Sequence, residues 1–567
     1  MLFSVACGGT DVSADDPVDT DDTTPVIEDA DINADSIRVS SVLGLNEQIC
    51  INILKPDSGE YAVSYRETGT ENFISVDKEL VLDDGDMLKC YILGLKKGVY
   101  DVRIETGSGE GLSRMTVHGI DVERQDRSGY AHFGREEGIG GYNNDGTVKD
   151  GAKILYVSNE TKNTVTMEIG GTTYTGLAAI LEANQHMEEP LIVRVLDTIV
   201  TNQWNSKEGS PSPEDYTSDY YSIGEAFSGE YGENLIGLPA PIFAEQIYEY
   251  ITTTAGITLL SVMDGETIYE RALNTILIEN TKDITIEGVG ENAGFCQIGI
   301  NFLYSDSIEI KNLTFSDYPA DGLSLQAYQS QGDTIVHGWY WIHNNTFNVG
   351  CQTWNGWGGP QDSDGDEAVS IADVRNVTLS YNEFYQTGKS MIFGGWEYDA
   401  CMNFSLHHNH YREAEQRLPL SRNSNIHSYN NYFDNCWRGL SPRTSSYVFS
   451  EVNYFENVDS PFYGDSGTET FGAVKSWNEI YYECGDIEFS EVVIASDREE
   501  YVENTCMPEE GTDCSKFDID PTLFYYDAEN KCSDVEFMLD PKDIPELIPK
   551  YAGAGSLARI DDPDTAE

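Results

Sequence analysis

Basic residues are scarce in this sequence. It has 34 Lys and Arg against 98 Asp and Glu, which gives 567 residues a formal net charge of −64 at pH 7. A surface of that sign repels nucleic acids and anionic membranes, so neither is expected as a partner. The charge suits a secreted protein whose self-repulsion is screened by salt. An enzyme of this composition that acted on a polyanion would need a local cluster of cations or a bound metal ion.

Long apolar runs and CxxC pairs are also missing. No stretch is long and apolar enough to span a membrane, and no CxxC pair indicates zinc. Eleven cysteines are present, and ten remain when Cys7 is set aside. In an exported protein some of these are expected to form disulfides. The local candidates are Cys50 with Cys90 and Cys506 with Cys514.

The first residues resemble the end of a bacterial lipoprotein signal. Ser4-Val5-Ala6-Cys7-Gly8 contains a cysteine of the kind that is lipidated after cleavage, although the basic part and most of the apolar part of such a signal are missing. An ordinary N-terminal cysteine is the alternative. The Asp- and Thr-rich run that follows is typical of a flexible tether. We expect residues 1–36 to be a signal remnant and tether of a secreted or outer-membrane-anchored bacterial protein, with Cys7 as the candidate lipid anchor.

Residues 37–125 predict a small β-sandwich. Short alternating segments such as QICINIL and MLKCYIL are separated by turns such as PDSGE and DDGD. The sequence does not reveal the function of this domain. A spacer and a carbohydrate-binding module are the alternatives, and we favour the spacer.

Residues 126–567 have a different sequence pattern, in which Asn-x-aromatic units recur after short apolar runs. The spacing of the aromatics is 22 to 27 residues after Phe384. A fixed period of this size indicates stacked repeats. The units lack a ten-residue amphipathic helix, which excludes helical and leucine-rich solenoids and leaves a parallel β-helix. Asn409, Asn431 and Asn453 should then stack as scaffold, and residues 201–270 form a long insertion. The repeating aromatics are Phe347, Phe384, Tyr411, Phe433, Phe455 and Tyr481.

Four of the few cations fall on successive repeats. Arg417 and Arg422 flank Pro419, Lys389 lies one repeat earlier, and Arg443 lies one repeat later. Because stacked rungs place equivalent positions about 4.8 Å apart, these side chains could line one cleft. The alternative is that each pairs with a surface carboxylate. For the cluster as a whole we favour the cleft.

Carboxylates precede these cations in the chain. Asp321 stands alone, and a dense acidic run follows at residues 362–367. Clustered hard oxygens are the ligands that Ca²⁺ prefers. A solvated acidic loop has the same composition, and the run lacks the spacing of an EF-hand. The candidate ligands are Asp321, Asp362, Asp364, Asp366 and Glu367.

Aromatic and histidine side chains lie in the same part of the sequence. Trp354, Trp357 and Trp396 are candidates for stacking on sugar rings, although a tryptophan in a loop more often packs. A histidine-rich segment suggests a metal site or a base, but its place in an Asn-aromatic repeat favours structural stacking. Its members are His407, His408 and His410.

The order of the motifs resembles a known family. DGLSLQ, WIHNNTF, DEAVSI, VTLSYNEF, GKSMIFGG, FSLHHNHY, RLPLSR, IHSYNNYF and GLSPR follow one another over residues 275–455, and IPKYAGAG stands near the C-terminus. This series is similar to the pectate lyase and pectin lyase superfamily of the polysaccharide lyase family 1 type, and most similar to its Ca²⁺-dependent pectate lyases. The resemblance implies an all-β fold, a right-handed single-stranded parallel β-helix, behind the N-terminal β-sandwich-like domain.

The resemblance also implies roles for the cations. Arg417 matches the residue that abstracts the C5 proton of the uronate. Lys389 and Arg422 match residues that hold the substrate carboxylate, and Arg443 matches a further substrate contact.

The implied metal site is less regular. Asp321 and Asp366 match ligands of Ca²⁺, but Ser370 occupies a position where the family has Asp. Glu367, Asp364 or Asp362 could compensate for this change. The family's usual Trp-Ile-Asp-His is also altered here, to residues 341–344 with the sequence WIHN.

The expected function is that of a monomeric, secreted pectate lyase. It would cleave α-1,4-linked polygalacturonate of plant or algal cell walls by β-elimination, with Ca²⁺ assisting, to 4,5-unsaturated oligogalacturonates. The first competing hypothesis is a Ca²⁺-independent pectin lyase acting on methyl-esterified pectin, which Ser370 favours and which Asp321, Asp366 and Lys389 oppose. The second is a hydrolase on a similar β-helix, which needs paired Asp residues. The third is a non-catalytic polysaccharide-binding protein.

Overall fold

The computed structural model describes residues 31–56, 59, 61–132, 135–200, 275–296, 298–316, 318, 321–327, 336–348, 367–395, 401–464, 472–487, 492–497 and 538–557. Several predictions concern parts of the chain outside these ranges. They are the lipid anchor at Cys7, the insertion near 201–270, the acidic residues Asp362, Asp364 and Asp366, the indoles of Trp354, Trp357 and Trp396, and the pair Cys506–Cys514.

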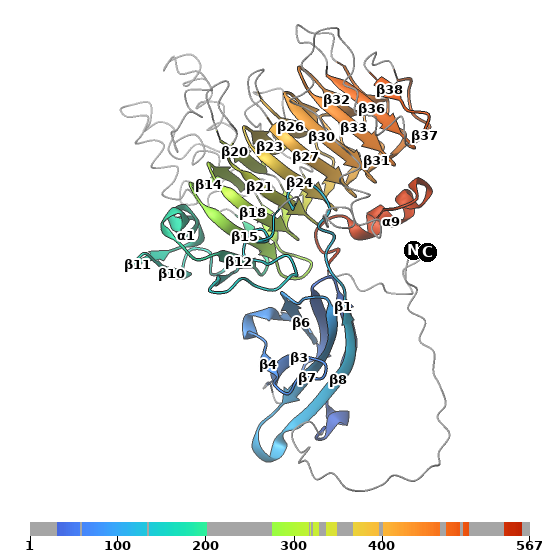
Figure 1. The fold of residues 1–567 in the computed structure, drawn as a ribbon. Helices are drawn as coiled ribbons and strands as arrows, with labels where there is room; N and C mark the ends of the chain where they lie inside the picture. Colours follow the sequence, from blue (N-terminus) through green and yellow to red (C-terminus); the bar gives the residue numbers. More distant parts are fainter. Residues whose placement is uncertain are drawn as a thin grey trace, which may run out of the picture.

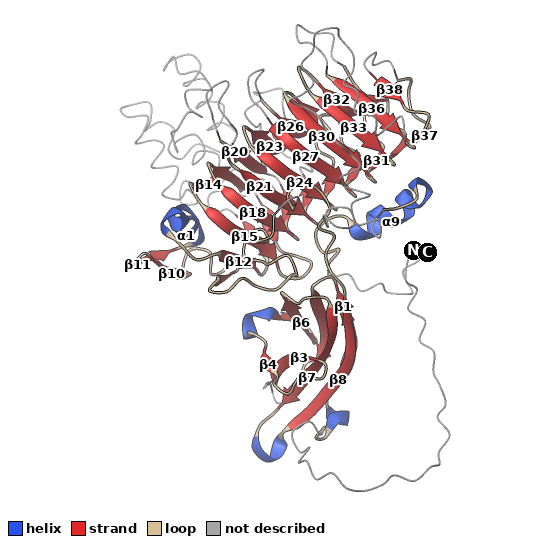
Figure 2. Ribbon diagram, in the orientation of Figure 1, coloured by secondary structure: helices blue, strands red, loops and turns tan. Residues whose placement is uncertain are grey.

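The N-terminal β domain consists of two antiparallel four-stranded sheets (Figures 1 and 2). Alternate residues of both sheets point into one core, which contains Ile51, Leu88, Val63 and Val102. The two sheets therefore pack face to face as a sandwich. One sheet has the order β1 (Val39–Leu45), β2 (Gln48–Leu54), β6 (Met87–Leu93), β5 (Val81–Asp84); the other has β4 (Ile74–Ser75), β3 (Tyr61–Glu67), β7 (Gly98–Thr106), β8 (Ser113–Val122). Short 3-10 helices cover Ala34–Ser36, Lys78–Leu80 and Gly109–Gly111.

The predicted disulfide between Cys50 and Cys90 is wrong. Both thiols are free and buried. In the antiparallel pair of β2 and β6, Cys90 lies opposite Ile51, whereas Cys50 lies opposite Tyr91. Side chains alternate between the two faces of a strand, so the two cysteines point to opposite faces of the sheet.

The rest of the described chain forms three long parallel sheets that stack rung upon rung (Figure 1). From β12 to β34 nearly every turn of the chain contributes one strand to each sheet, and the predicted parallel β-helix is confirmed. The eleven-stranded sheet contains β9 (Lys153–Val157), β12 (Leu191–Val195), β15 (Lys282–Gly288), β18 (Asp306–Lys311), β21 (Gly338–His343), β24 (Arg375–Ser380), β27 (Cys401–His407), β30 (Ser424–Tyr429), β33 (Tyr447–Glu451), β36 (Ala473–Trp477) and β38 (Val492–Ile494).

The other two sheets complete each rung. The nine-stranded sheet contains β13 (Thr198–Val200), β16 (Gly294–Cys296), β19 (Thr314–Ser316), β22 (Thr346–Asn348), β25 (Glu383–Tyr385), β28 (His410–Arg412), β31 (Tyr432–Asp434), β34 (Tyr454–Glu456) and β37 (Ile480–Tyr482). The eight-stranded sheet contains β14 (Thr275–Glu279), β17 (Gly299–Leu303), β20 (Leu323–Gln326), β23 (Glu367–Ala372), β26 (Lys389–Phe393), β29 (Leu420–Ser421), β32 (Arg438–Pro442) and β35 (Ser460–Phe462).

Helices lie at the margins of this core. The amphipathic α1 (Leu177–Glu182) buries Leu177, Ile180 and Leu181 against the first rungs, beside the hairpin of β10 (Thr166–Ile169) and β11 (Thr172–Thr175) and a 3-10 turn at Ala183–His186. A 3-10 turn at Pro541–Asp543 leads into α9 (Ile544–Tyr551), which packs Ile544 and Ile548 on Tyr432 (Figure 2). No helix in the described ranges combines the length and apolar character that crossing a membrane requires.

An aromatic ladder fills the core, as the 22-to-27-residue period predicts. Phe347 stacks on Phe384 with 5.1 Å between ring centroids, and Phe433 stacks on Phe455 at 4.4 Å. Because each ring touches the ring of the next rung, the ladder fixes the register between rungs. Its members in order are Phe295, Phe315, Phe347, Phe384, Tyr411, Phe433, Phe455 and Tyr481.

An asparagine ladder runs through the same rungs, and the predicted stacking of Asn409, Asn431 and Asn453 is confirmed. The Asn409 amide N–H donates to Asn431 Oδ1 at 3.0 Å, and Asn431 repeats this bond to Asn453 Oδ1 at 2.8 Å. The ladder begins at Asn345 and passes through Asn382. Each side chain thus satisfies backbone groups at a buried turn where strand pairing cannot do so.

A strap, defined as residues 125–132 and 135–142, crosses the outer face of the eleven-stranded sheet. Its backbone N–H groups donate to hydroxyls on the strands. The Tyr130 N–H bonds Ser405 Oγ at 3.1 Å, and the Ala131 N–H bonds Thr378 Oγ1 at 3.0 Å. The backbone of the strap therefore forms hydrogen bonds with side chains that point outward from the rungs.

Buried charges lie on the same face. Lys311 contacts Glu287 at 3.2 Å and Glu309 at 3.5 Å, and His343 Nε2 lies 3.2 Å from Glu309 Oε1. Burial alone would raise the pKa of Glu309, but Lys311 and His343 lower that pKa to about 2. These pairs keep the carboxylates charged beneath the strap.

We expect the free energy of unfolding to fall as pH drops below about 6.5. Burial lowers the pKa of His132, His343 and His407, so the unfolded chain binds protons that the folded chain rejects. The depressed pKa of Glu309 acts in the same direction at lower pH, because its contribution is lost as pH falls toward about 2. Each pKa unit corresponds to about 1.4 kcal/mol. Urea unfolding followed at several pH values measures the slope.

The variant His132→Phe should flatten that slope, because the buried His132 ring is one of those whose pKa burial lowers. A stability that stays constant between about pH 6.5 and pH 4 in the wild type would contradict the expectation.

Candidate active site

The predicted site residues in the described chain lie on five neighbouring strands of the eight-stranded sheet, β20, β23, β26, β29 and β32. This sheet is separate from the one that the strap covers. The structure thus brings together segments more than a hundred residues apart in the sequence. Asp321 precedes β20, Glu367 and Ser370 are in β23, Lys389 opens β26, Arg417 and Arg422 flank β29, and Arg443 follows β32.

Strand register sets the order of charges at the start of these strands. Leu323 pairs with Val369, which places Asp321 opposite Glu367, and the Gly322 N–H donates to the Glu367 carbonyl at 3.0 Å. Glu367 in turn pairs with Lys389. Two carboxylates and an ammonium group therefore occupy successive rungs, about 4.8 Å apart along the backbone.

Arg417 sits on the rung after Lys389. Its backbone has a φ of 61°, in the left-handed region that few non-glycine residues adopt. The Met391 N–H donates to its carbonyl at 2.8 Å, so this unusual bend is anchored to β26. The Arg417 guanidinium Nη1 forms an ion pair with Glu367 Oε1. The Arg417 side chain keeps 25% of its surface exposed, whereas that of Glu367 keeps 6%.

Arg422 and Arg443 lie at the opposite end of the strands from Arg417. The Arg422 side chain is buried, and its Nη1 donates to the carbonyls of Gly394 at 2.9 Å and Gly395 at 3.2 Å. The Arg443 backbone N–H donates to the Ser421 carbonyl at 2.8 Å. The four predicted cations therefore share one sheet, in two pairs separated by the length of a strand.

Hard oxygen ligands are present among the described residues. Asp321 Oδ2 accepts a hydrogen bond from Ser324 Oγ at 2.8 Å, and Ser324 pairs with Ser370 in the next rung. Ser370 lies three residues after Glu367, on the side of β23 whose residues alternate with the buried Val369 and Ile371. Asp321 and Glu367 are thus the described carboxylates that could hold a cation here.

Sequence reasoning missed a stacked group on the rung after Arg417. The Arg438 guanidinium lies 3.8 Å from the Trp437 ring centroid and 3.7 Å from that of Tyr463. Its Nη1 donates to Gln416 Oε1 at 3.3 Å. The backbone of Gln416 pairs with that of Lys389 in an isolated parallel β-bridge. The Trp437 side chain is exposed. The sequence contains a signal for this contact, because Arg438 follows Gln416 by 22 residues, which is one period of the repeat and predicts that the two are neighbours.

Comparison with known proteins gives a consistent result. The sequence pattern of the pectate lyase family matches residues 246–495. Pectate lyase 2 of Pectobacterium carotovorum is 32% identical over 203 residues, which are 34% of this chain and 50% of that protein. Pectate lyase C of Dickeya chrysanthemi is 28% identical over 288 residues, which are 49% of this chain and 68% of that protein. The chain spans about half the length of the first of these relatives.

Among solved structures, pectate lyase II from Xanthomonas campestris pv. campestris aligns with a TM-score of 0.44 and 18% identity, over 76% of this chain and 99% of that one. The sequence match is the more informative finding, since it spans β20 to β32. Residues 246–495 include every strand on which the site residues from Asp321 to Arg443 lie, so the part of the chain that holds the candidate site is similar to the pectate lyase family.

Proposed function

We propose that this protein is a pectate lyase, which cleaves α-1,4-linked polygalacturonate by β-elimination. The observation that carries the proposal is the partly exposed Arg417 on a strained bend, one rung from Lys389, in the part of the chain that matches the family. Its relatives in Pectobacterium and Dickeya bear the name pectate lyase, which is consistent with this substrate.

The elimination requires a base and positively charged groups that stabilise the developing negative charge. The C5 proton of a uronate lies next to a carboxylate, and its removal pushes further charge onto that group. Lys389 and Arg422 would hold substrate carboxylates at the two ends of these strands, and Arg443 would contact a neighbouring sugar. Arg417 would accept the C5 proton. The electron pair then forms the C4–C5 double bond, the C4–O4 bond breaks, and O4 takes a proton from water.

An arginine base needs a neutral guanidine, because the guanidinium form cannot accept a proton. The ion pair with Glu367 stabilises the charged form and therefore opposes the reaction. We infer that Glu367 must withdraw from Arg417 before turnover. Once it has withdrawn, the nearby charge of Lys389 disfavours a second cation and shifts Arg417 toward its neutral form.

The described residues fit a Ca²⁺ site in part. Asp321 and Glu367, on adjacent rungs, would supply carboxylate oxygens, and Ser370, which alternates with Glu367 along β23, would supply at most a weaker hydroxyl ligand. When bound, Ca²⁺ would add positive charge beside the substrate carboxylate. The same ligand set gives Glu367 an alternative partner to Arg417. The remaining proposed ligands are Asp362, Asp364 and Asp366.

One further feature suits a polysaccharide substrate, and another suits a place outside the cell. The exposed Trp437 ring, braced by Arg438, offers a flat apolar face of the kind that stacks on a sugar. The net charge of −64 suits a monomer that works outside the cell, for which Cys7 is the proposed lipid anchor.

The function is tested by cleavage of polygalacturonate, monitored by the ultraviolet absorbance of the unsaturated product. We expect absorbance to rise with Ca²⁺ and to stop rising when a chelator is added. A hydrolase would release sugars without the absorbance change, and a binding protein would release none. Activity on highly methylated pectin that survives the chelator would replace the proposal with a Ca²⁺-independent pectin lyase.

A further inference from the structure

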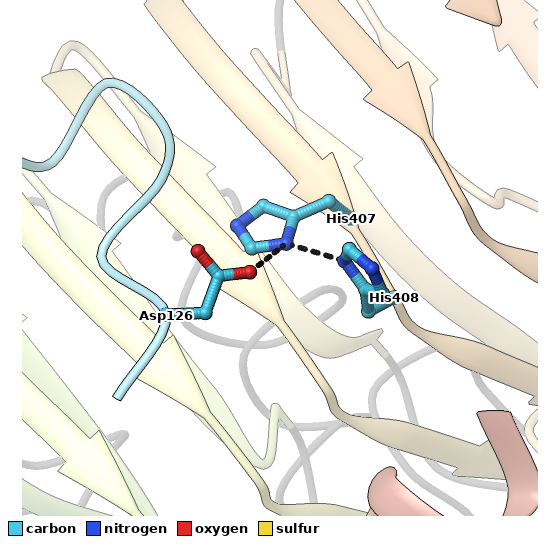
Figure 3. Close-up of side chains that lie close together, drawn as sticks. All are labelled: Asp126, His407 and His408. Carbon is cyan, nitrogen blue, oxygen red and sulfur yellow. Dashed lines mark hydrogen bonds and ion pairs between the residues drawn. The ribbon is translucent and has the colours of Figure 1, made fainter. Parts of the chain in front are cut away.

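Three buried side chains with metal-binding atoms meet where the strap crosses β27 (Figure 3). Asp126 comes from the strap, His407 ends β27, and His408 follows it. The distance from His407 Nδ1 to His408 Nδ1 is 2.9 Å, and that from His407 Nδ1 to Asp126 Oδ2 is 3.8 Å. One ligand atom from each residue lies within 4.8 Å of the others. The group belongs to the eleven-stranded sheet, not to the sheet of Arg417.

The orientation of His407 is set by its second nitrogen. Nε2 lies 3.2 Å from the Ser128 carbonyl oxygen. A carbonyl can only accept, so Nε2 carries the hydrogen, and Nδ1 of the neutral ring presents a lone pair. A histidine whose outer N–H bonds a backbone carbonyl is the arrangement commonly seen around metal ligands.

Asp126 is a buried carboxylate with neutral donors around it. Oδ1 accepts from the Ser128 N–H at 2.9 Å and from Ser128 Oγ at 2.5 Å, and Oδ2 accepts from the Tyr381 hydroxyl at 3.0 Å. Within the described chain no lysine or arginine pairs with Asp126, and the side chain within ion-pair distance of its carboxylate is that of His407. Burying a carboxylate without a cation is costly, and such groups are usually paired or bound to a metal. Asp126 Oδ2 and His407 Nδ1 therefore face each other without a lysine or arginine between them.

We propose that Asp126 Oδ2, His407 Nδ1 and His408 Nδ1 bind one Zn²⁺ ion. Zinc bonds of about 2.0–2.1 Å in a tetrahedron separate neighbouring ligand atoms by about 3.3 Å, and the observed 2.9 and 3.8 Å lie on either side of that value. Two imidazoles with one carboxylate favour Zn²⁺ over Ca²⁺, which takes oxygen ligands. The Tyr381 hydroxyl is a candidate for the fourth position. The ion would join the strap to a strand 281 residues away in the sequence.

The site differs in position and chemistry from the proposed Ca²⁺ site, and it does not depend on the proposed function. Its role would be structural, because all three ligands are buried. Each of the two histidine rings stacks on a tyrosine ring. His408 stacks on Tyr381 at 4.6 Å, and His407 stacks on Tyr429 at 4.7 Å. The alternative is a hydrogen bond from one Nδ1–H to the other Nδ1, without any metal.

The test is the metal content of the untagged full chain, expressed in medium supplemented with ZnCl₂ and dialysed against metal-free buffer. We expect about one Zn²⁺ per chain by elemental analysis, retained in the presence of excess CaCl₂. Expression with CoCl₂ should give the visible absorption of tetrahedral Co²⁺. Asp126→Asn and His408→Gln should each lower the zinc content at least about tenfold.

His427→Gln is the matched control, because His427 is a fully buried histidine that contacts a carboxylate, Glu451 Oε1, at 2.9 Å. It should keep the wild-type zinc content. A wild-type protein with less than about 0.1 Zn²⁺ per chain and no Co²⁺ absorption, even after refolding with the metal, would overturn the proposal. So would an Asp126→Asn variant with full occupancy. If that variant fails to fold, the wild-type stoichiometry and Co²⁺ spectrum decide.

Discussion

Arg417→Lys should lower the rate of polygalacturonate cleavage by a factor of about 10² to 10⁴ while leaving the protein folded. Lysine keeps a positive charge but places one ammonium group where Arg417 has a planar guanidinium. The ammonium is shorter in reach, and its single nitrogen cannot take the place of the guanidinium nitrogen that would face C5 once Glu367 has withdrawn. The measurement is the initial rate of ultraviolet absorbance at saturating substrate, together with substrate binding by calorimetry. Binding should persist because Lys389 and Arg422 are intact.

Arg412→Lys provides the matched control. Arg412 also pairs with a glutamate, Glu383 Oε1 at 2.9 Å, and lies over Tyr385, but it is on the nine-stranded sheet. Its substitution should leave the cleavage rate unchanged. An Arg417→Lys variant with more than about a tenth of the wild-type rate would rule out Arg417 as the base. A proportional loss of both rate and binding would instead indicate a role in holding the substrate.

The β-helix could be predicted from the sequence because its signals are local and periodic. Every rung needs one aromatic in the core and one asparagine at a turn, so the spacing of Phe384, Tyr411 and Phe433 reports the period of the fold directly. The scarcity of cations made the candidate site recognisable in the sequence. Lys389 and Arg417 stand out in a chain with 98 acidic residues, and the structure places them on adjacent rungs.

Contacts between distant segments could not be predicted in this way. The ion pair of Arg417 with Glu367 depends on which way two side chains turn at the start of their strands, and no sequence period encodes that choice. Asp126 reaches His407 because the strap folds back across the sheet. The error on Cys50 and Cys90 has a similar origin. The pair was proposed because the two cysteines lie in the same small domain, and the strand register that puts the thiols on opposite faces could not be read from the sequence.

Asn409→Ala should lower the free energy of unfolding by about 3–6 kcal/mol, a large part of the 5–15 kcal/mol typical of a folded domain. The Asn409 side chain makes four buried hydrogen bonds. Nδ2 donates to the Leu379 carbonyl at 2.9 Å and to Asn431 Oδ1 at 3.0 Å, while Oδ1 accepts from the Asn382 N–H at 3.0 Å and from Asn382 Nδ2 at 3.1 Å. Alanine leaves these groups without partners in a site that water cannot reach. Urea unfolding at neutral pH measures the loss.

The cause is tested by comparison with Asn144→Ala. Asn144 is an exposed asparagine whose Nδ2 donates to the Arg135 carbonyl at 2.8 Å, where water can replace the bond. Its substitution should cost less than about 1 kcal/mol. Equal losses in the two variants would show that the ladder adds nothing beyond ordinary hydrogen bonding. Because the ladder passes through the rungs that position Lys389 and Arg417, a loss confined to Asn409→Ala should also bring earlier thermal inactivation. In that case the stacked asparagines, which touch no substrate, set the temperature range over which the site keeps its geometry.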